Sequence, residues 1–259
     1  MVGGAGWVAE KFDRRAASYD QSASHRWQAQ QAVEFLAPAR GERVLDVATG
    51  TGLAAREAVG LLGPDGFVVG TDISAGMLRV AREAAGGQRC WFVQADAAAA
   101  PFRSGVFDAV ACVAGVSYLP DPTAALVEWG RVCRATGRAV VTTPPVEGIT
   151  TARVLRQAAA DEGMELVNPG GPLADPVQRA QVLAAAGWAE QGVDEVVFEQ
   201  PRSEPDAAFG WVDSGFAEPV RTAPPPVRER VRVRFEARYR AESVEQHRVL
   251  LLRLVPSSS

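Results

Sequence analysis

Three aspartates end or follow successive apolar runs near the start of the chain, and each could hold part of a small ligand. Asp46 lies between Leu45 and Val47, where an ionised carboxylate costs free energy unless a cation or hydrogen-bond donors pair with it. Asp72 could accept both hydroxyls of a ribose, and Asp96 could accept a hydrogen bond from an exocyclic amine. Together the three acids predict a site for a nucleoside that carries positive charge.

A turn of small residues, residues 48–52, follows Asp46 directly. Its glycines let the backbone approach a ligand, and the helix that starts after them points free N–H groups into the same space. The turn also fits a dinucleotide-binding fingerprint, because Asp72 lies about 20 residues further on. However, Asp46 would repel a pyrophosphate, whereas it would attract the ammonium and sulfonium groups of S-adenosylmethionine. An Asp46 satisfied by backbone amides of the turn is the structural alternative.

These residues need a scaffold that brings strand ends together. Apolar runs predict strands at residues 44–48, 67–71, 90–93, 107–113 and 139–142, with helical segments between them. Ser74 and the pair Asp121-Pro122 are favourable helix starts. Strands that alternate with helices predict a parallel sheet with right-handed crossovers, whose ligands bind at the carboxyl ends of the strands. The three acids should therefore line one edge of this sheet.

The second half follows another pattern, because helical segments at residues 149–163 and after Asp175-Pro176 precede two further strands, residues 192–198 and 249–255. A helical excursion at about residues 203–240 separates these strands and predicts a cap inserted into an antiparallel pair. The expected fold is α/β, a Rossmann-like doubly wound sheet of seven strands, mostly parallel with an antiparallel C-terminal strand, N-terminal helices and a small helical cap. We expect one domain over residues 1–259, divided into N-terminal cap helices (1–40), a cofactor-binding half (41–145) and a substrate-side half (146–259).

The composition excludes several classes of protein. Apolar residues make up 47% and charged residues 22% at a net charge of −4, which is ordinary for a globular protein and predicts no nucleic-acid or membrane partner. No targeting segment and no apolar run of the ~18 residues needed to span a bilayer is recognisable, so we expect a cytoplasmic protein. Cys90, Cys112 and Cys133 are set among apolar neighbours and predict free core thiols. With His25 and His247 as the only histidines, no metal site is expected.

The same residues resemble a known family. Segments 44–52, 70–78, 94–97, 107–110 and 119–122 are similar to the class I S-adenosylmethionine-dependent methyltransferases, in the branch that includes the ubiquinone and menaquinone biosynthesis enzymes and many methyltransferases of bacterial secondary metabolism. The resemblance covers roughly residues 8–145. It is specific for the cofactor and carries little information about the acceptor.

The resemblance implies roles for particular residues. Gly50 and Gly52 would pass beneath the methionine part, Asp72 would hold the ribose, and Asp96 with Ala97 the adenine. Tyr19 matches an N-terminal pattern in which the tyrosine helps to close the cofactor pocket. The expected cofactor-binding residues are Tyr19, Asp46, Ala48, Gly50, Gly52, Asp72, Ile73, Met77, Asp96, Ala97 and Val113. The structural alternatives are a helix-entry role for Asp72, a turn for Asp96 and core packing for Met77.

Catalytic candidates are fewer, because methyl transfer is an in-line displacement in which a base is optional. His25 has an ordinary pKa suited to deprotonating a hydroxyl; the structural alternative is that it is a histidine on a helix surface. Tyr118 could orient an acceptor or simply pack. The family often has two histidines where this chain has Ser117-Tyr118, which argues against a base in that loop. His247 is expected to be structural. The cap aromatics Phe209, Trp211, Phe216, Phe235 and Tyr239 could enclose an apolar acceptor or only pack the cap.

The expected function is S-adenosylmethionine-dependent methyl transfer to an O, C or N atom of a small, hydrophobic natural product or quinone-like acceptor, with S-adenosylhomocysteine as product. One alternative is a protein that binds the cofactor but steers a cyclisation. A more remote alternative is an NAD-dependent dehydrogenase, which Asp46 disfavours. The sequence does not decide the acceptor, and a homodimer stays open.

Overall fold

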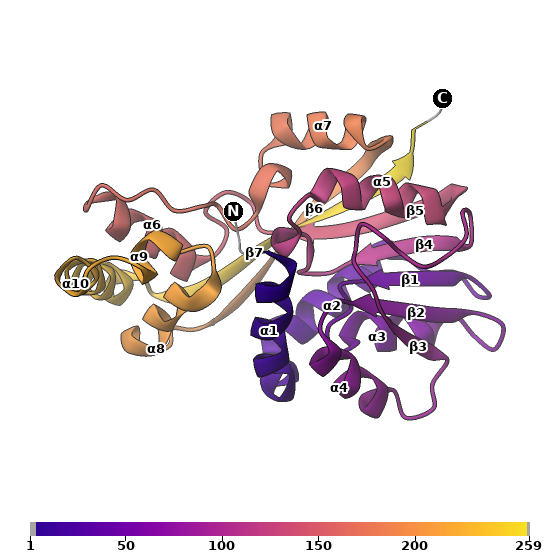
Figure 1. The fold of residues 1–259 in the computed structure, drawn as a ribbon, viewed down its shortest axis with the longest axis horizontal. Coiled ribbons are helices and arrows are strands. Elements are labelled where there is room, and N and C mark those ends of the chain that lie inside the picture. The colour runs from indigo at the N-terminus through magenta and orange to yellow at the C-terminus, as the bar shows by residue number, and fades with distance from the viewer. Residues whose placement is uncertain (1–3, 258–259) are drawn as a thin grey trace.

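The computed structural model describes residues 4–257, and a single sheet of seven strands runs through it in the order β3-β2-β1-β4-β5-β7-β6 (Figure 1). The strands are β1 (Arg43–Val47), β2 (Phe67–Asp72), β3 (Cys90–Gln94), β4 (Phe107–Cys112), β5 (Cys133–Thr143), β6 (Trp188–Pro201) and β7 (Val244–Pro256). The first five strands pair in parallel, and β7 pairs antiparallel with both β5 and β6. The predicted fold class is confirmed.

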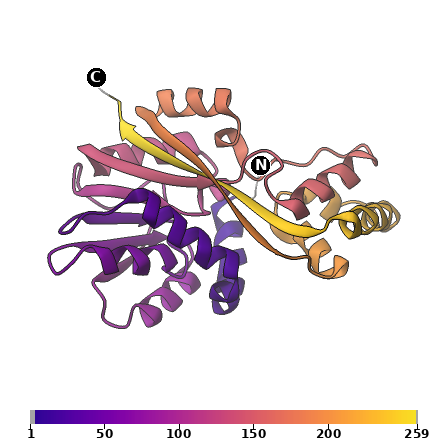
Figure 2. The same cartoon turned by 180° about the vertical axis from the view of Figure 1, so that it is seen from behind.

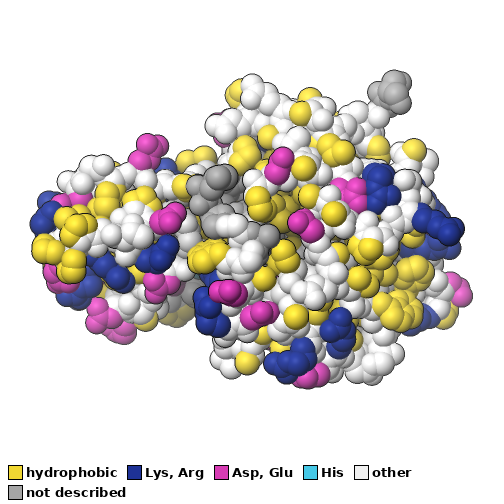
Figure 3. Space-filling view, viewed as in Figure 1, with side chains coloured by type: hydrophobic (Ala, Val, Ile, Leu, Met, Phe, Trp, Pro, Cys, Tyr) yellow, Lys and Arg dark blue, Asp and Glu magenta, His cyan; other side chains and the backbone are white. Residues whose placement is uncertain are grey.

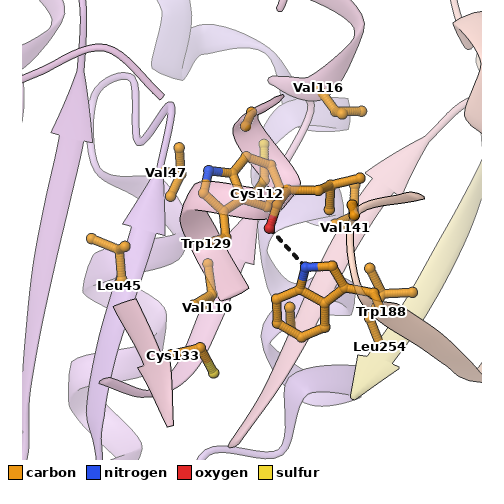
Figure 4. Packing of buried hydrophobic residues seen from close by; sticks show 14 of the residues in the cluster. Leu45, Val47, Val110, Cys112, Val116, Trp129, Cys133, Val141, Trp188 and Leu254 are labelled. Atoms are coloured by element: carbon orange, nitrogen blue, oxygen red, sulfur yellow. Dashed lines mark hydrogen bonds between the residues drawn. The ribbon is translucent and has the colours of Figure 1, made fainter. Parts of the chain in front are cut away.

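Helices cover both faces of the sheet because its strands are apolar on both sides. On one face lie α2 (Ala23–Leu36), α3 (Leu53–Leu61) and α4 (Ala75–Ala85), and on the other α5 (Pro122–Val132) and α7 (Pro176–Ala185). Trp129 and Trp188 are fully buried on the second face, beside Leu45 and Val110 (Figure 4). The Trp188 Nε1 donates to the Leu126 carbonyl at 2.8 Å, so this large ring leaves no unpaired polar group.

The N-terminal segment crosses the carboxyl edge of the sheet. It consists of α1 (Ala5–Arg15) and the 3₁₀ helix η1 (Ala16–Gln21), which leads into α2. Two carboxylates fix it: Asp13 accepts from the Ser74 hydroxyl at 2.6 Å and from the Gly76 N–H at 2.8 Å, and Asp20 pairs with Arg56 at 3.0 Å. Both contacts lie at the first turns of α4 and α3, where backbone donors and the helix dipole favour an anion.

Strands β6 and β7 extend well beyond the sheet as a two-stranded ribbon. Residues 250–254 of β7 pair with β5, whereas residues 244–256 pair with β6. Figure 2 shows the ribbon running from the sheet into a helical lobe. That lobe, which we call the cap, contains α6 (Thr150–Ala160), α8 (Pro205–Phe209), the 3₁₀ helix η4 (Gly210–Ser214), α9 (Glu218–Arg221) and α10 (Pro225–Ala241). An insertion between two antiparallel strands is what the sequence predicted.

The basic stretch of α10 is balanced by acids. Arg230 and Arg234 contact Glu162 at 2.8 and 3.0 Å, and Arg238 contacts Asp161 at 2.6 Å. Basic and acidic side chains accordingly alternate over the cap in Figure 3. The stretch is therefore a solvated helix face, and nothing in it resembles a phosphate-binding patch.

The structure also describes three features that the sequence analysis considered: membrane-spanning helices, metal-binding clusters and the cysteines. Within residues 4–257 no helix is long and apolar enough to cross a membrane. The described residues also contain no cluster of His, Cys, Asp and Glu that could hold a metal ion. Cys90, Cys112 and Cys133 are buried free thiols, as expected.

Candidate active site

A pocket of about 80 Å³ opens at the carboxyl edge of the parallel strands. Its lining contains every predicted cofactor residue except Asp46 and Gly52, and it also contains Tyr118. The predicted residues that line it are Tyr19, Ala48, Gly50, Asp72, Ile73, Met77, Asp96, Ala97 and Val113. Residues scattered over the first half of the chain thus meet at one edge, as a parallel sheet requires.

Asp72 ends β2 and is held by two backbone donors. Its Oδ2 accepts from the Gly50 N–H at 2.8 Å, and its Oδ1 accepts from the Ser74 N–H at 2.9 Å. Burial raises the pKa of this carboxyl, although those hydrogen bonds act in the opposite direction. Each carboxylate oxygen has a further lone pair, so Asp72 both positions the glycine turn and can accept from a ligand.

The turn after β1 adopts backbone conformations that few residues tolerate. Gly50 has φ +56° and Gly52 φ +79°, and even the non-glycine residues Ala48 and Ala114 have φ 52° and 56°. A Cβ on Gly52 would lie 3.0 Å from the Phe92 ring. The structure therefore places Gly52 beneath the turn, outside the pocket lining, where it lets α3 pack closely. Strained left-handed residues of this kind gather at functional sites.

Asp46 lies one layer deeper than the sequence suggested. It lines an adjoining cavity of about 30 Å³, together with Tyr19, His25 and Gln28. Its Oδ2 accepts from the Thr49 hydroxyl at 2.5 Å, and burial raises the pKa of the carboxyl to about 7. A buried acid that is half protonated near neutral pH is a group that a bound cation would ionise fully.

A third cavity of about 840 Å³ lies between the N-terminal helices, the cap and the β6–β7 ribbon. We call it the acceptor cavity. It shares four lining residues with the cofactor pocket: Phe12, Tyr19, Ala114 and Tyr118. The Phe12 and Tyr118 rings meet edge to face at 4.9 Å. The two cavities therefore adjoin at a mainly aromatic wall.

His25 stands beside that wall. Its ring stacks on Tyr19 with centroids 4.1 Å apart, and its Nδ1 lies 3.3 Å from the Tyr19 carbonyl. Since a carbonyl only accepts, Nδ1 carries the hydrogen and the Nε2 lone pair is left free. Burial lowers the pKa of His25 to about 4, so the ring is neutral but a weaker base than its ordinary pKa suggests. His25 is half-buried and lines the acceptor cavity.

The five cap aromatics divide into two groups. Phe209, Phe235 and Tyr239 are buried in the core of the cap, where they pack on one another. Only Trp211 and Phe216 line the acceptor cavity. Both alternatives left open by the sequence thus occur: three of the rings pack the cap together and two line the cavity. Helical spacing in the sequence does not tell an inward-facing ring from a cavity-facing one.

Sequence reasoning missed other cavity residues. Lys11, the only lysine of the chain, is buried, and its Nζ donates to the Ser214 carbonyl in the cap. The Nζ lies 4.8 Å from the centroid of the Tyr118 ring and 5.1 Å from that of Trp7. Burial lowers the pKa of Lys11 to about 8. A lone lysine in an amphipathic helix gave no signal of this, since its partners come from distant segments.

Comparisons with known proteins agree with this geometry. Residues 44–137 match a family model described as a methyltransferase domain. The chain is 36% identical over 152 residues to the demethylmenaquinone methyltransferase of Clavibacter sepedonicus, covering 54% of this chain and 60% of that protein. The chain spans less than two thirds of the length of the curated relatives it matches.

Solved structures share the fold at low identity. One is a chain of the complex between the Haloferax volcanii Trm112 methyltransferase activator and a protein described as a methyltransferase, with TM-score 0.66, 20% identity, and coverage of 97% of this chain and 98% of that one. Another is the [4+2]-cyclase SpnF, with TM-score 0.55, 17% identity, and coverage of 89% and 82%. At these identities the likeness concerns the fold alone.

Proposed function

We propose that this chain, which matches a methyltransferase domain over residues 44–137, is a class I S-adenosylmethionine-dependent methyltransferase, as its sequence predicts, and that it transfers the methyl group of that cofactor to a small acceptor. The observation that carries the proposal is the shared wall between the two cavities. A methyl donor in the cofactor pocket and a nucleophile in the acceptor cavity would meet there. Such alignment accounts for most of the catalysis of an in-line displacement.

We infer the cofactor roles from which residues line the two cavities. Asp72 would hold the ribose, Asp96 and the Ala97 backbone the adenine edge, and Ile73 and Met77 its face. Val113 and Ala48 would lie near the methionine part. Asp46 would stabilise the ammonium group from the adjoining cavity, and Gly50 and Gly52 would keep the turn open. Tyr19 closes the pocket, supported by the contacts of Asp13 and Asp20 with α4 and α3.

The cofactor supplies an electrophilic methyl on a sulfonium, and the protein supplies orientation and a place for the proton. We assign His25 as the acceptor of a hydrogen bond from the nucleophile through its free Nε2. Because its pKa is low, it orients a hydroxyl more than it deprotonates it. Tyr118, whose pKa burial raises, stays a neutral hydroxyl that can donate or accept at the shared wall.

The acceptor is a small, mainly hydrophobic molecule, such as a natural product or quinone-like compound. The relative named above acts, by its name, on demethylmenaquinone, and Trp211 and Phe216 give the cavity aromatic surface. We place the protein in the cytoplasm, which its free cysteines support. We further propose that residues 1–259 form one domain, of which residues 1–3 and 258–259 lie outside the described part.

A second function keeps the same cofactor without methyl transfer. The pair Ser117-Tyr118 in place of histidines supports a protein that uses the capped cavity to steer a cyclisation. In that case S-adenosylhomocysteine would not form during turnover. Formation of even a stoichiometric amount with the true acceptor would exclude this alternative.

The test is calorimetric titration of the full chain with S-adenosylmethionine, S-adenosylhomocysteine and NADH, beside the Asp72→Ala variant. We expect micromolar binding of the first two ligands, at least about 100-fold weaker binding in the variant, and no binding of NADH; a 100-fold loss corresponds to about 2.7 kcal/mol. An Asp108→Ala variant, changed at an acid outside all three cavities, should bind normally. Tight binding of NADH instead would overturn the proposal.

A further inference from the structure

The β6–β7 ribbon forms a polar floor in the acceptor cavity. Side chains alternate along a strand, and the antiparallel register places Gln200 opposite Glu245 and Phe198 opposite His247. Gln200, Glu245 and His247 all line the cavity. These three side chains lie together on the ribbon, away from the wall shared with the cofactor pocket, and neither the methyltransferase domain nor its cofactor explains them.

Glu245 is a buried carboxylate in this subsite. It is 7% exposed, and it accepts from the Thr151 hydroxyl at 2.6 Å and from the Gln200 amide at 3.0 Å. Burial by itself would raise the pKa of Glu245, but its interactions with His247, Thr151 and Gln200 outweigh burial and lower the pKa to about 2. The group is therefore an anion at neutral pH, and its hydrogen bonds come from neutral donors.

A permanently charged partner is missing among the described residues. The nearest basic group is His247, whose Nε2 lies 3.7 Å from Glu245 Oε1, is buried and makes no hydrogen bond. The other basic residues of the cavity are engaged elsewhere: Lys11 with the cap, Arg248 with Glu195 at 2.6 Å, and Arg15 above the Tyr19 ring. Among the described residues no Lys or Arg side chain is paired with Glu245, so a cation that enters the cavity can form a charge-assisted hydrogen bond with it.

We propose that Glu245, beside His247 on the ribbon, binds an ammonium group of the acceptor, which makes the acceptor an amine-bearing small molecule; this rests on the proposed methyl-transfer function. An ammonium has a full charge and three donors. Glu245 Oε1 and Oε2 retain lone pairs for it. Trp27 also lines the cavity and provides an aromatic face for a cation.

The ammonium is a recognition group and not the methylated atom. Neither Glu245 nor His247 lines the cofactor pocket, whereas Tyr19 and Tyr118 line both cavities. An acceptor anchored at the floor by its amine would therefore present a different atom at the shared wall. Anionic acceptors would be repelled by Glu245, and neutral ones would gain no charge-assisted hydrogen bond.

The experiment compares three probes of one skeleton: tryptamine (cationic), tryptophol (neutral) and indole-3-acetate (anionic). Each is titrated into the full chain by calorimetry at pH 7, with and without saturating S-adenosylhomocysteine. We expect tryptamine to bind at least about tenfold more tightly than tryptophol, and indole-3-acetate most weakly. In Glu245→Gln, which preserves the shape of the side chain, the preference for tryptamine should fall to within about twofold.

Two controls isolate the subsite. Asp213→Asn removes an exposed acid from the same cavity and should keep the tenfold preference, because solvent screens that charge. His247→Gln should keep most of it, because the carboxylate remains. Equal binding of the three probes to the unmodified protein overturns the proposal without any variant, and so does an unchanged preference in Glu245→Gln.

The readout separates this proposal from the function on which it rests. Amine binding is measured without methyl transfer, so loss of S-adenosylhomocysteine binding would contradict the methyltransferase proposal alone. A protein that binds S-adenosylhomocysteine but shows no preference for tryptamine would contradict the ammonium subsite alone.

Discussion

Residues 41–145 and residues 146–259 contribute strands to the same sheet, yet they position their functional side chains differently. In the first half, most residues that line the cofactor pocket lie at or just after the end of a parallel strand, so the order of strands determines the pocket. In the second half, Gln200, Glu245 and His247 lie near the cap end of the β6–β7 ribbon, and all three line the acceptor cavity. Strand ends can be located from a sequence, whereas the inward face of an isolated ribbon depends on what packs against it.

The prediction with the largest expected effect destabilises the cap and tests whether the cofactor pocket is affected. Phe235 is fully buried in the cap and stacks 5.2 Å from Tyr239. Phe235→Ala should lower the free energy of unfolding of the cap by about 3–5 kcal/mol, measured by amide hydrogen exchange. S-adenosylhomocysteine affinity should change less than about twofold, and Val233→Ala, at an exposed position of α10, should do almost nothing. A large loss of cofactor affinity would mean that the halves are not separable.

A second prediction concerns pH and belongs to the first half. Because the pKa of Asp46 is raised to about 7, binding a ligand with an ammonium group must remove its proton at lower pH. S-adenosylhomocysteine affinity should therefore fall by about tenfold per pH unit below 7 and level off above it. Calorimetry between pH 5.5 and 7.5 should show proton uptake by the buffer, which disappears in Asp46→Asn. An S-adenosylhomocysteine affinity of the unmodified protein that does not change with pH would contradict this role of Asp46.

A third prediction uses two matched tryptophans of one core, seen in Figure 4. Trp129 Nε1 donates to the Ala97 carbonyl at 2.9 Å, and Trp188 Nε1 donates to the Leu126 carbonyl at 2.8 Å. Replacing either with Phe removes a hydrogen bond and leaves a smaller ring in a tightly packed core, and should cost about 1–3 kcal/mol of stability. Only Trp129→Phe should also weaken S-adenosylhomocysteine binding, by about fivefold (about 1 kcal/mol), because Ala97 borders the pocket. Equal S-adenosylhomocysteine affinities in the two variants would contradict the link between Trp129 and the cofactor pocket.

The smallest effect is expected on the cap surface. Arg232 contacts Glu229 and Glu236 at 2.6 and 2.5 Å on an exposed face of α10. Arg232→Ala should lower the free energy of unfolding by less than about 1 kcal/mol, and the loss should shrink further in high salt. Urea unfolding at two salt concentrations measures this. A loss of several kcal/mol would make the ion pairs, and not the apolar core, responsible for the cap.

The difference between strand ends and the β6–β7 ribbon also explains which residues could be predicted from the sequence. Asp72, Asp96 and Ser74 were found because acids and caps at strand and helix boundaries have local signatures. The extension of β7 back to Val244 was not found, since residues 245–248 are polar on both faces and show no apolar alternation. For the same reason His247 was expected to be structural, although it faces the acceptor cavity.

Burial also changed the chemistry of residues that were located correctly. His25 was chosen for its ordinary pKa, which its surroundings lower, and those surroundings come from η1 and the ribbon. Asp46 was placed in the cofactor pocket but lies in the cavity beneath it. Neither depth nor desolvation can be read from a local pattern, because both depend on segments far apart in the chain.

The pairing of Pro201 with Val244 has a consequence for how this protein could diversify. Residues 202–243 leave and rejoin the ribbon at two positions that lie directly opposite each other. An insertion whose ends already meet can be lengthened, shortened or exchanged while the ladder on either side of it keeps its register. The segment of residues 202–243 is therefore a replaceable module, whereas the ribbon residues that line the acceptor cavity belong to the sheet.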